Sequence, residues 1–127
     1  MMTRTLMLAA LPAALLAGCA TIPQANDSPD GFAAFGQTTT AGRIKVRPET
    51  LVEDSRCPMN ARCIWAGRVV VDSSVWVDGQ KYPARLTLGE PFPIAGGAVV
   101  LDSVEPSRTI QDGAIPAKAY RFHFDFR

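Results

Sequence analysis

Residues 68–80 have the sequence RVVVDSSVWVDGQ, and this stretch predicts the fold of the domain. Four of its valines occupy odd-numbered positions and therefore share one face of an extended strand: Val69, Val71, Val75 and Val77. The Asp78-Gly79 dipeptide then separates this run from a second extended run, and such a dipeptide is typical of the two-residue turn of a β-hairpin. We therefore expect an antiparallel hairpin at this point of the chain.

The return strand of the hairpin is expected over residues 80–88. Pro83 lies within it, and proline has no backbone N–H to donate to a neighbouring strand. Its presence indicates that this strand lies at the edge of a sheet or contains a bulge.

Two further runs predict short strands. Residues 43–47 alternate basic and apolar side chains, and Pro48 is expected to interrupt the strand that they form. Residues 98–104 are mostly apolar and lie between Gly96-Gly97 and Pro106, which indicate turns at both ends.

The last eight residues alternate most regularly. Their even positions are aromatic and share one face: Tyr120, Phe122, Phe124 and Phe126. Their odd positions are polar: Arg121, His123, Asp125 and Arg127. Because a domain of this size must bury its apolar faces to fold, we expect the aromatic face to lie in the core. The alternative is a row of four rings that binds a ligand.

No amphipathic helix pattern accompanies these runs. Short strands separated by turn residues indicate an all-β domain, built as a small antiparallel β-sandwich or barrel. About five to seven strands fit its length.

A different pattern occupies the start of the chain. Arg4 supplies a positive charge, residues 6–16 are apolar, and Leu16-Ala17-Gly18-Cys19 follows. A charged start, a short apolar core and small residues before the cleavage site are typical of a secretory signal peptide. The cysteine directly after Leu-Ala-Gly resembles the lipobox of bacterial lipoproteins.

This resemblance implies that residues 1–18 are removed and that acyl chains on Cys19 attach the protein to a membrane. Ala20 and Thr21 follow, and the absence of aspartate there favours the outer membrane, facing the periplasm, over the inner membrane. An ordinary signal peptide would instead leave Cys19 as an unpaired thiol. A spanning helix is disfavoured, because the apolar run has about half of the roughly 20 residues that a span needs.

The sequence thus divides into a lipoprotein signal peptide at 1–18, a flexible tether at 19–36 and a β-domain at 37–127. The tether is expected because residues 23–31 are rich in proline, glycine and polar side chains. Without Arg4, 12 basic side chains face 12 acidic ones. Such a nearly neutral chain lacks the basic surface of a nucleic-acid-binding protein.

Residues 53–67, EDSRCPMNARCIWAG, are the internal segment richest in chemically reactive and charged side chains. They resemble a motif, Asp-Ser-Arg-Cys-Pro, a short spacer and then Cys-x-Trp-x-Gly, that occurs in small bacterial secreted proteins and lipoproteins of no established activity. The resemblance implies a type of module with a similar order of short strands, and it implies no reaction.

Cys57 and Cys63 are expected to form a disulfide. Once Cys19 is acylated, only these two thiols remain, and an exported chain meets oxidising conditions. We also expect Trp65 to pack beneath the resulting loop. Arg56 is expected to form an ion pair with Asp54 or Glu53 at the loop entrance.

A closed loop on a β-scaffold is a common place for recognition, because it loses little entropy on binding. The candidate contacts to an envelope protein or polymer are Arg56, Met59, Asn60 and Arg62. No pattern of catalytic residues accompanies them. We therefore expect a binding or structural protein without a cofactor rather than an enzyme.

A metal or redox accessory protein of the envelope is the alternative. Cys57, Cys63, Met59 and His123 are soft ligands of the kind that copper prefers, although their spacing matches no zinc motif. The five-residue spacer between the cysteines also differs from the Cys-x-x-Cys arrangement of redox-active disulfides. His123 and Asp125 would stand side by side on the solvent face of one strand, with no nucleophile beside them.

Overall fold

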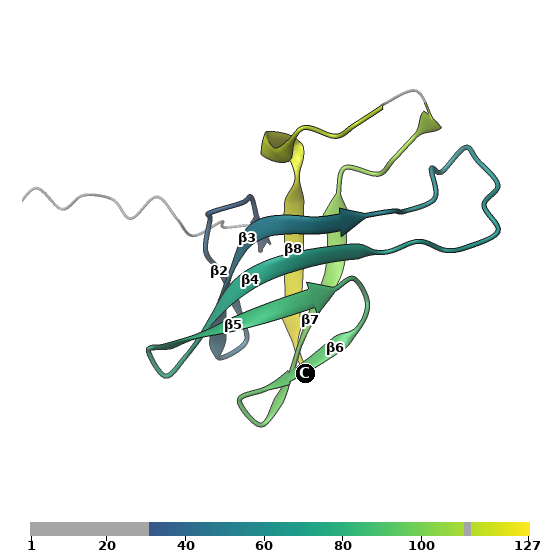
Figure 1. Ribbon diagram of the computed structural model, residues 1–127. Helices are drawn as coiled ribbons and strands as arrows, with labels where there is room; N and C mark the ends of the chain where they lie inside the picture. Colours follow the sequence, from purple (N-terminus) through teal and green to yellow (C-terminus); the bar gives the residue numbers. More distant parts are fainter. Residues whose placement is uncertain (1–30, 111–112) are drawn as a thin grey trace, which may run out of the picture.

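The computed structural model describes residues 31–110 and 113–127, which contain eight strands in two four-stranded antiparallel sheets. The strands are β1 (Phe32–Ala33), β2 (Thr39–Ala41), β3 (Ile44–Asp54), β4 (Val69–Val77), β5 (Gln80–Thr87), β6 (Pro91–Ile94), β7 (Gly97–Glu105) and β8 (Arg121–Phe126). One sheet has the order β1-β8-β7-β6 and the other β2-β3-β4-β5. Figure 1 shows β7 and β8 lying behind β3, β4 and β5 as a second layer.

These two layers confirm the predicted all-β sandwich. The barrel alternative is wrong, because the two sheets share no hydrogen-bonded pair of strands. The described residues also contain more strands than the five to seven expected. The additional ones are β1, β2 and β6, which have two to four residues each and are too short to show an alternating pattern.

The hairpin between β4 and β5 is as predicted. Asp78 and Gly79 have φ angles of 49° and 80°, the positive values that both turn residues of a type I′ hairpin require. Val77 pairs with Gln80 directly across this turn. Because β5 is the last strand of its sheet, Pro83 lies on an edge strand, which confirms one of the two positions expected for it.

Pro48 does not interrupt the first predicted strand, because β3 continues through it to Asp54. Its carbonyl accepts a hydrogen bond from the Gly36 N–H at 2.8 Å, on the side away from β4. The nitrogen and carbonyl of one extended residue point the same way, so the missing N–H removes no bond to β4. A register shift follows between Pro48 and Thr50.

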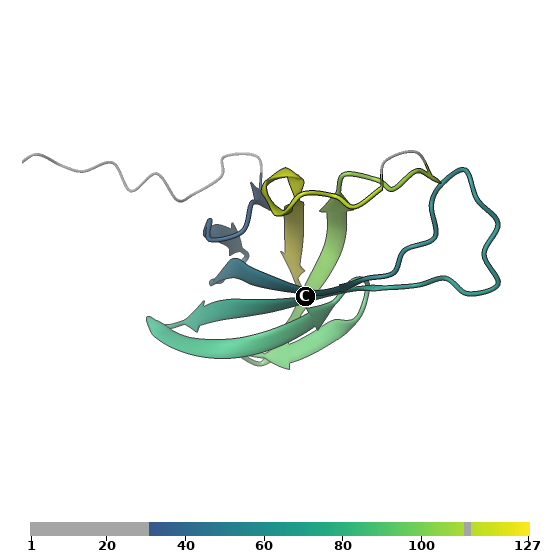
Figure 2. The same ribbon diagram turned by 45° about the horizontal axis from the view of Figure 1, so that its top comes forward.

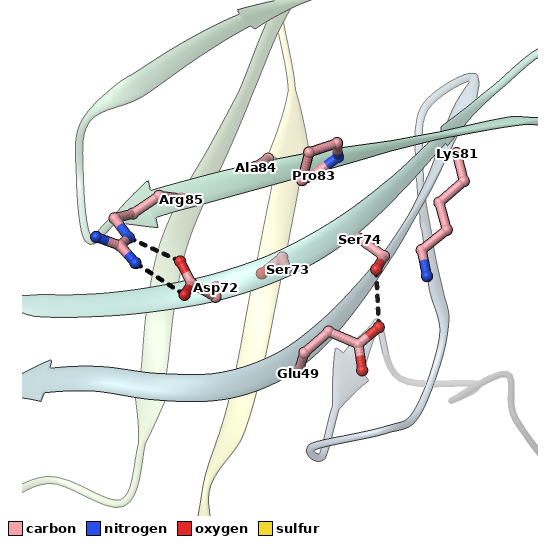
Figure 3. A pocket seen from close by; sticks show the side chains of 8 residues that line it. All are labelled: Glu49, Asp72, Ser73, Ser74, Lys81, Pro83, Ala84 and Arg85. Carbon is pink, nitrogen blue, oxygen red and sulfur yellow. Dashed lines mark hydrogen bonds and ion pairs between the residues drawn. The ribbon is translucent and has the colours of Figure 1, made fainter.

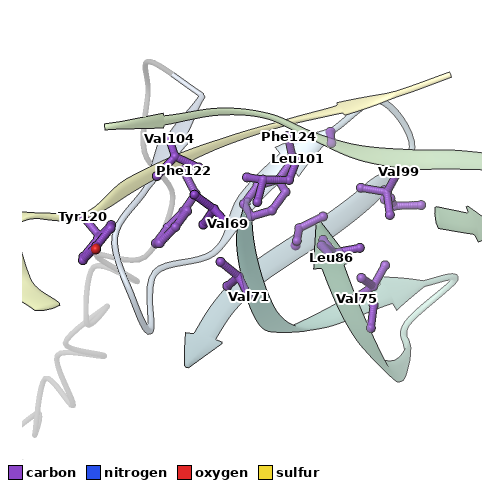
Figure 4. Packing of buried hydrophobic residues seen from close by; sticks show 14 residues of the cluster. Val69, Val71, Val75, Leu86, Val99, Leu101, Val104, Tyr120, Phe122 and Phe124 are labelled. Atoms are coloured by element: carbon purple, nitrogen blue, oxygen red, sulfur yellow. The ribbon is translucent and has the colours of Figure 1, made fainter. Parts of the chain in front are cut away.

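The core lies between the two sheets (Figure 4). The odd-numbered valines of β4 face it, and Val69, Val71 and Val75 are fully buried. From the other sheet, Phe122 is fully buried and Phe124 is 3% exposed. The aromatic face of the last strand is therefore core, as expected.

The β-domain begins earlier than residue 37. Phe32 pairs with His123 across β1 and β8, and the ring of Phe35 lies 4.9 Å from that of Phe122. The assignment of residues 31–36 to the tether is therefore wrong, since two aromatic side chains in this polar stretch dock on the sandwich. Cys19, the signal peptide and the remainder of the tether lie outside the described residues.

Candidate binding loop

The disulfide loop comprises residues 55–67, which connect β3 to β4 and project beyond the sheets (Figures 1 and 2). Its ends are joined where the Ser55 N–H donates to the Arg68 carbonyl at 2.8 Å and the Arg68 N–H donates to the Ser55 hydroxyl at 3.0 Å. Gly67 has a φ of +68°, and a Cβ at this position would lie 1.9 Å from the Ser55 carbonyl oxygen. Only glycine fits where the loop closes.

Cys57 and Cys63 form the predicted disulfide, with 5.9 Å between their Cα atoms. The Ala61 N–H donates to the Pro58 carbonyl at 3.0 Å and forms a turn within the ring. No residue of the disulfide loop belongs to the core cluster of the described chain. The loop is therefore held in shape by covalent and polar contacts rather than by apolar packing.

Removing the disulfide with Cys57→Ser and Cys63→Ser is expected to lower the free energy of unfolding by about 2 kcal/mol, because the unfolded chain regains the entropy of an open loop. Urea unfolding of the two proteins measures this difference. Mass spectrometry of the parent protein should show the loss of two hydrogens across the pair. Equal unfolding midpoints for both proteins would contradict a stabilising role for the crosslink.

An ion pair fixes the entrance of the loop. Arg56 Nε and Nη2 donate to the two carboxylate oxygens of Asp54 at 2.9 and 2.8 Å, and Arg56 Nη1 donates to the Val104 carbonyl at 3.2 Å. The predicted pairing with Asp54 is confirmed, and Glu53 pairs with Arg68 instead. The Arg56 side chain is only 15% exposed, so Arg56 stabilises the loop entrance and offers a partner little of its surface.

Tyr120 completes this buried cluster, since its hydroxyl donates to Asp54 Oδ2 at 2.7 Å. Burial and the hydrogen bond to the Asp54 carboxylate raise the pKa of Tyr120 to about 12. Burial by itself would raise the pKa of Asp54, but the hydrogen bonds from Arg56 and Tyr120 and the guanidinium charge outweigh it and lower that pKa. The cluster is thus an ion pair beside a neutral phenol at neutral pH.

These shifts predict how stability depends on pH. The lowered pKa of Asp54 stabilises the fold above about pH 4, and this contribution is lost as the pH falls further. The raised pKa of Tyr120 acts in the opposite range: its contribution is complete below about pH 10 and is lost as the pH rises toward 12. Thermal unfolding across this range should show both losses.

Tyr120→Phe is expected to reduce the loss of stability at alkaline pH, because the titrating phenol is gone. Tyr82→Phe is the matched control, since Tyr82 is 41% exposed on the edge strand. If stability falls equally at alkaline pH in Tyr120→Phe and in the control, another group causes the loss.

The connection between β7 and β8 supports one side of the disulfide loop. Arg108 Nη1 donates to the Asp54 carbonyl at 3.1 Å, and the Met59 N–H donates to the Arg108 carbonyl at 2.8 Å. The Ile110 N–H donates to Asn60 Oδ1 at 2.8 Å. Asn60 therefore holds the neighbouring segment in place with its side-chain oxygen. The sequence did not indicate Arg108, because only the fold brings it next to residues some 50 positions away.

Four large apolar side chains stand in solvent at this end of the molecule. They are Met59 (75% exposed), Ile64 (95%), Trp65 (63%) and Ile110 (60%), here called the apolar tip. The prediction that Trp65 packs beneath the loop is wrong. A ring of about seven residues closed by its own disulfide has no interior that could cover an indole, and Trp65 stays 63% exposed among the described residues.

Arg62 is the remaining candidate contact. It is exposed, and it has no ion-pair partner within residues 31–110 and 113–127. Of the four residues expected to contact a partner, Met59, Asn60 and Arg62 are exposed, and Asn60 also binds the neighbouring segment through its side-chain oxygen. Arg56 is engaged at the loop entrance. Ile64, Trp65 and Ile110 join the candidate site from the structure.

The outer face of β3, β4 and β5 carries a polar hollow of about 530 Å³ (Figure 3). Its lining residues are Glu49, Asp72, Ser73, Ser74, Lys81, Pro83, Ala84 and Arg85. Arg85 Nε and Nη2 donate to Asp72 at 2.7 and 2.9 Å, and the Ser74 hydroxyl donates to Glu49 at 2.8 Å. These four side chains are engaged with one another, whereas the buried Ser73 hydroxyl has no hydrogen-bond partner among the described residues.

The copper-ligand set considered from the sequence is not brought together. His123 Nδ1 lies 2.6 Å from Asp102 Oδ1, and its ring lies 5.2 Å from that of Phe32, so its neighbours belong to β7 and β1. Asp125 pairs with Arg127 at 3.0 Å rather than with His123. The disulfide occupies both loop cysteines, and no group of three or more His, Cys, Asp or Glu side chains in the described chain could hold a metal ion.

No family model, curated protein or solved structure matches this chain. No helix in the described ranges is long and apolar enough to cross a bilayer. Inference about function therefore rests on the disulfide loop and on the sequence that precedes residue 31.

Proposed function

We propose that this chain is a lipid-anchored protein of the bacterial cell envelope whose β-domain binds a partner through the disulfide loop and performs no catalysis. The lipobox-like Leu16-Ala17-Gly18-Cys19 supports the anchor. The oxidising periplasm suits the Cys57–Cys63 disulfide.

The observation that carries the binding role is the apolar tip. Ile64 is 95% and Trp65 63% exposed, although the tip stands on a loop that a disulfide and a buried ion pair hold in one shape. Several large apolar side chains exposed on one loop and the segment beside it are typical of an interaction site. Tryptophan is also among the residues that contribute most to binding energy at interfaces.

The anchor is tested by expressing the full chain in a bacterial host supplied with labelled palmitate. We expect label in the membrane fraction and a mature chain that begins at Cys19, and neither in Cys19→Ala. An unlabelled, uncleaved precursor with three reactive thiols would contradict the anchor.

The loop is tested by crosslinking the acylated protein in native envelopes and comparing variants. Trp65→Ser and the Cys57→Ser, Cys63→Ser pair should lose the crosslinked partner. Tyr82→Ser, which removes an exposed aromatic ring from the edge strand, should retain it. A partner that survives both loop variants would show that another surface binds it.

A further inference from the structure

We infer that the partner of the apolar tip is a lipid surface: the tip inserts into the interface of a bilayer that contains anionic headgroups. This inference rests on the proposed function of the same loop and names what the loop binds. It follows from the exposure, chemistry, charge and reach of the loop.

The apolar tip protrudes instead of lining a groove. The disulfide loop extends past the ends of the sheets in both ribbon views (Figures 1 and 2). All four tip side chains are at least 60% exposed, so few neighbouring atoms could form walls around a partner segment. A fluid bilayer can receive a protruding side chain without a preformed complementary pocket.

The side chains of the apolar tip suit the layers of a membrane interface, from the acyl chains to the headgroups. Ile64 and Met59 present alkyl groups that gain from contact with acyl chains. Trp65 has an apolar ring and one polar N–H, and such side chains prefer the boundary between headgroups and hydrocarbon. The three side chains come from one closed loop, so they would enter the interface together.

The charge of the loop favours anionic lipid. Residues 55–68 contain three arginines and no carboxylate. Two of them are neutralised at the loop base, Arg56 by Asp54 and Arg68 by Glu53. Arg62 therefore carries the uncompensated charge of the exposed part, and its long side chain can reach a headgroup phosphate while its stem stays in the apolar layer.

The backbone of the loop limits how deep the insertion goes. The N–H groups of Met59 and Ala61 donate to carbonyls of the protein. The loop is nevertheless neither a helix nor part of a sheet, and irregular backbone cannot enter the hydrocarbon, where unpaired polar groups are costly. The tip should therefore rest at the interface, where water still reaches these groups.

The tether lets the loop reach the bilayer that holds the anchor. Gly31, the first described residue, follows Cys19 by 12 positions. Such a segment spans up to about 40 Å when extended, which exceeds the roughly 30 Å diameter of a small domain. The β-domain can thus lie with its loop against the membrane, held by the acyl chains at one point and the apolar tip at another.

The test uses the acylated full-length mature protein, in excess equimolar phosphatidylglycerol–phosphatidylcholine vesicles whose acyl chains carry bromine near the headgroup. Trp76→Phe leaves Trp65 as the only reporter, and Trp65→Phe leaves Trp76 on the sheet. We expect the bromines to quench at least half of the Trp65 emission and little of the Trp76 emission. Adding Ile64→Asp to Trp76→Phe should reduce the quenching of Trp65 to the level of Trp76.

Arg62→Gln, in the Trp76→Phe background, should lower the ratio of inserted to free tip about five-fold on these vesicles and have little effect on phosphatidylcholine alone. Flotation of the Ile64→Asp variant, whose tip no longer inserts, reports the anchor separately. Flotation of parent and variant with equal quenching of both tryptophans in the parent would overturn the lipid inference and leave the anchor standing. Quenching of Trp65 in the parent together with loss of flotation in Ile64→Asp would support the inference and contradict the anchor, and the loss of both would contradict both.

Discussion

Replacing Phe122 with alanine is expected to lower the free energy of unfolding by about 4 kcal/mol, the largest effect of any single change considered for this chain. Phe122 is fully buried between the sheets, with the rings of Phe35 at 4.9 Å and Tyr120 at 5.8 Å. The substitution removes apolar burial and leaves a cavity that the flanking strands cannot close. Urea or thermal unfolding of the purified variant measures the loss.

Trp65→Ala is the matched control, because it also deletes a large aromatic side chain. Its expected change is within about 0.5 kcal/mol, since a ring that is 63% exposed contributes little to the core. A Trp65→Ala loss comparable to that of Phe122→Ala would show that Trp65 is buried in solution, and the apolar tip would lose its basis.

Asp54→Asn is expected to destabilise the protein by about 3 kcal/mol. The amide has nearly the shape of the carboxylate but no charge, so it leaves the charge of the Arg56 guanidinium uncompensated although its side chain is only 15% exposed. Tyr120 at the same time exchanges a charged acceptor for a neutral one, which makes a weaker hydrogen bond. Because this cluster joins β3, β7 and the start of β8, the loss should appear in global unfolding.

The control for Asp54→Asn is Asp72→Asn, which removes the partner of a bidentate arginine at the protein surface. The Arg85–Asp72 pair is mostly exposed, with side chains 64% and 43% accessible, and exposed pairs contribute little in water. We expect a much smaller change in the unfolding midpoint than for Asp54→Asn. Equal losses would mean that burial of the Asp54 pair has no energetic role.

Much of the fold could be predicted because its signals are local. Alternation in β4 and β8 shows which faces are buried, and Asp78-Gly79 satisfies the positive φ angles of its turn within two residues. The disulfide was likewise predictable from the number of cysteines and from the resemblance of the start of the chain to an export signal. The strands that escaped prediction have at most four residues, and β1 exists because Phe32 and Phe35 find a surface that only the folded domain provides.

The candidate site was harder to predict, because its contacts are distant in sequence. Arg108 and Tyr120 lie more than 50 positions from Asp54, and nothing near either residue indicates that they share it. The sequence also led us to expect Trp65 beneath the disulfide loop. Its exposure follows from the small size of the ring that precedes it, which a residue pattern does not reveal.

The proposed function requires that covalent and ionic contacts hold the apolar tip in water, open to a partner. Quenching of the Trp76→Phe protein by acrylamide, in buffer without lipid, tests this most directly. We expect Trp65 to be quenched almost as strongly as a short tryptophan peptide, and unfolding in urea to change its quenching little. A shielded, blue-shifted Trp65 that becomes accessible only when the disulfide is reduced or the chain unfolds would contradict it.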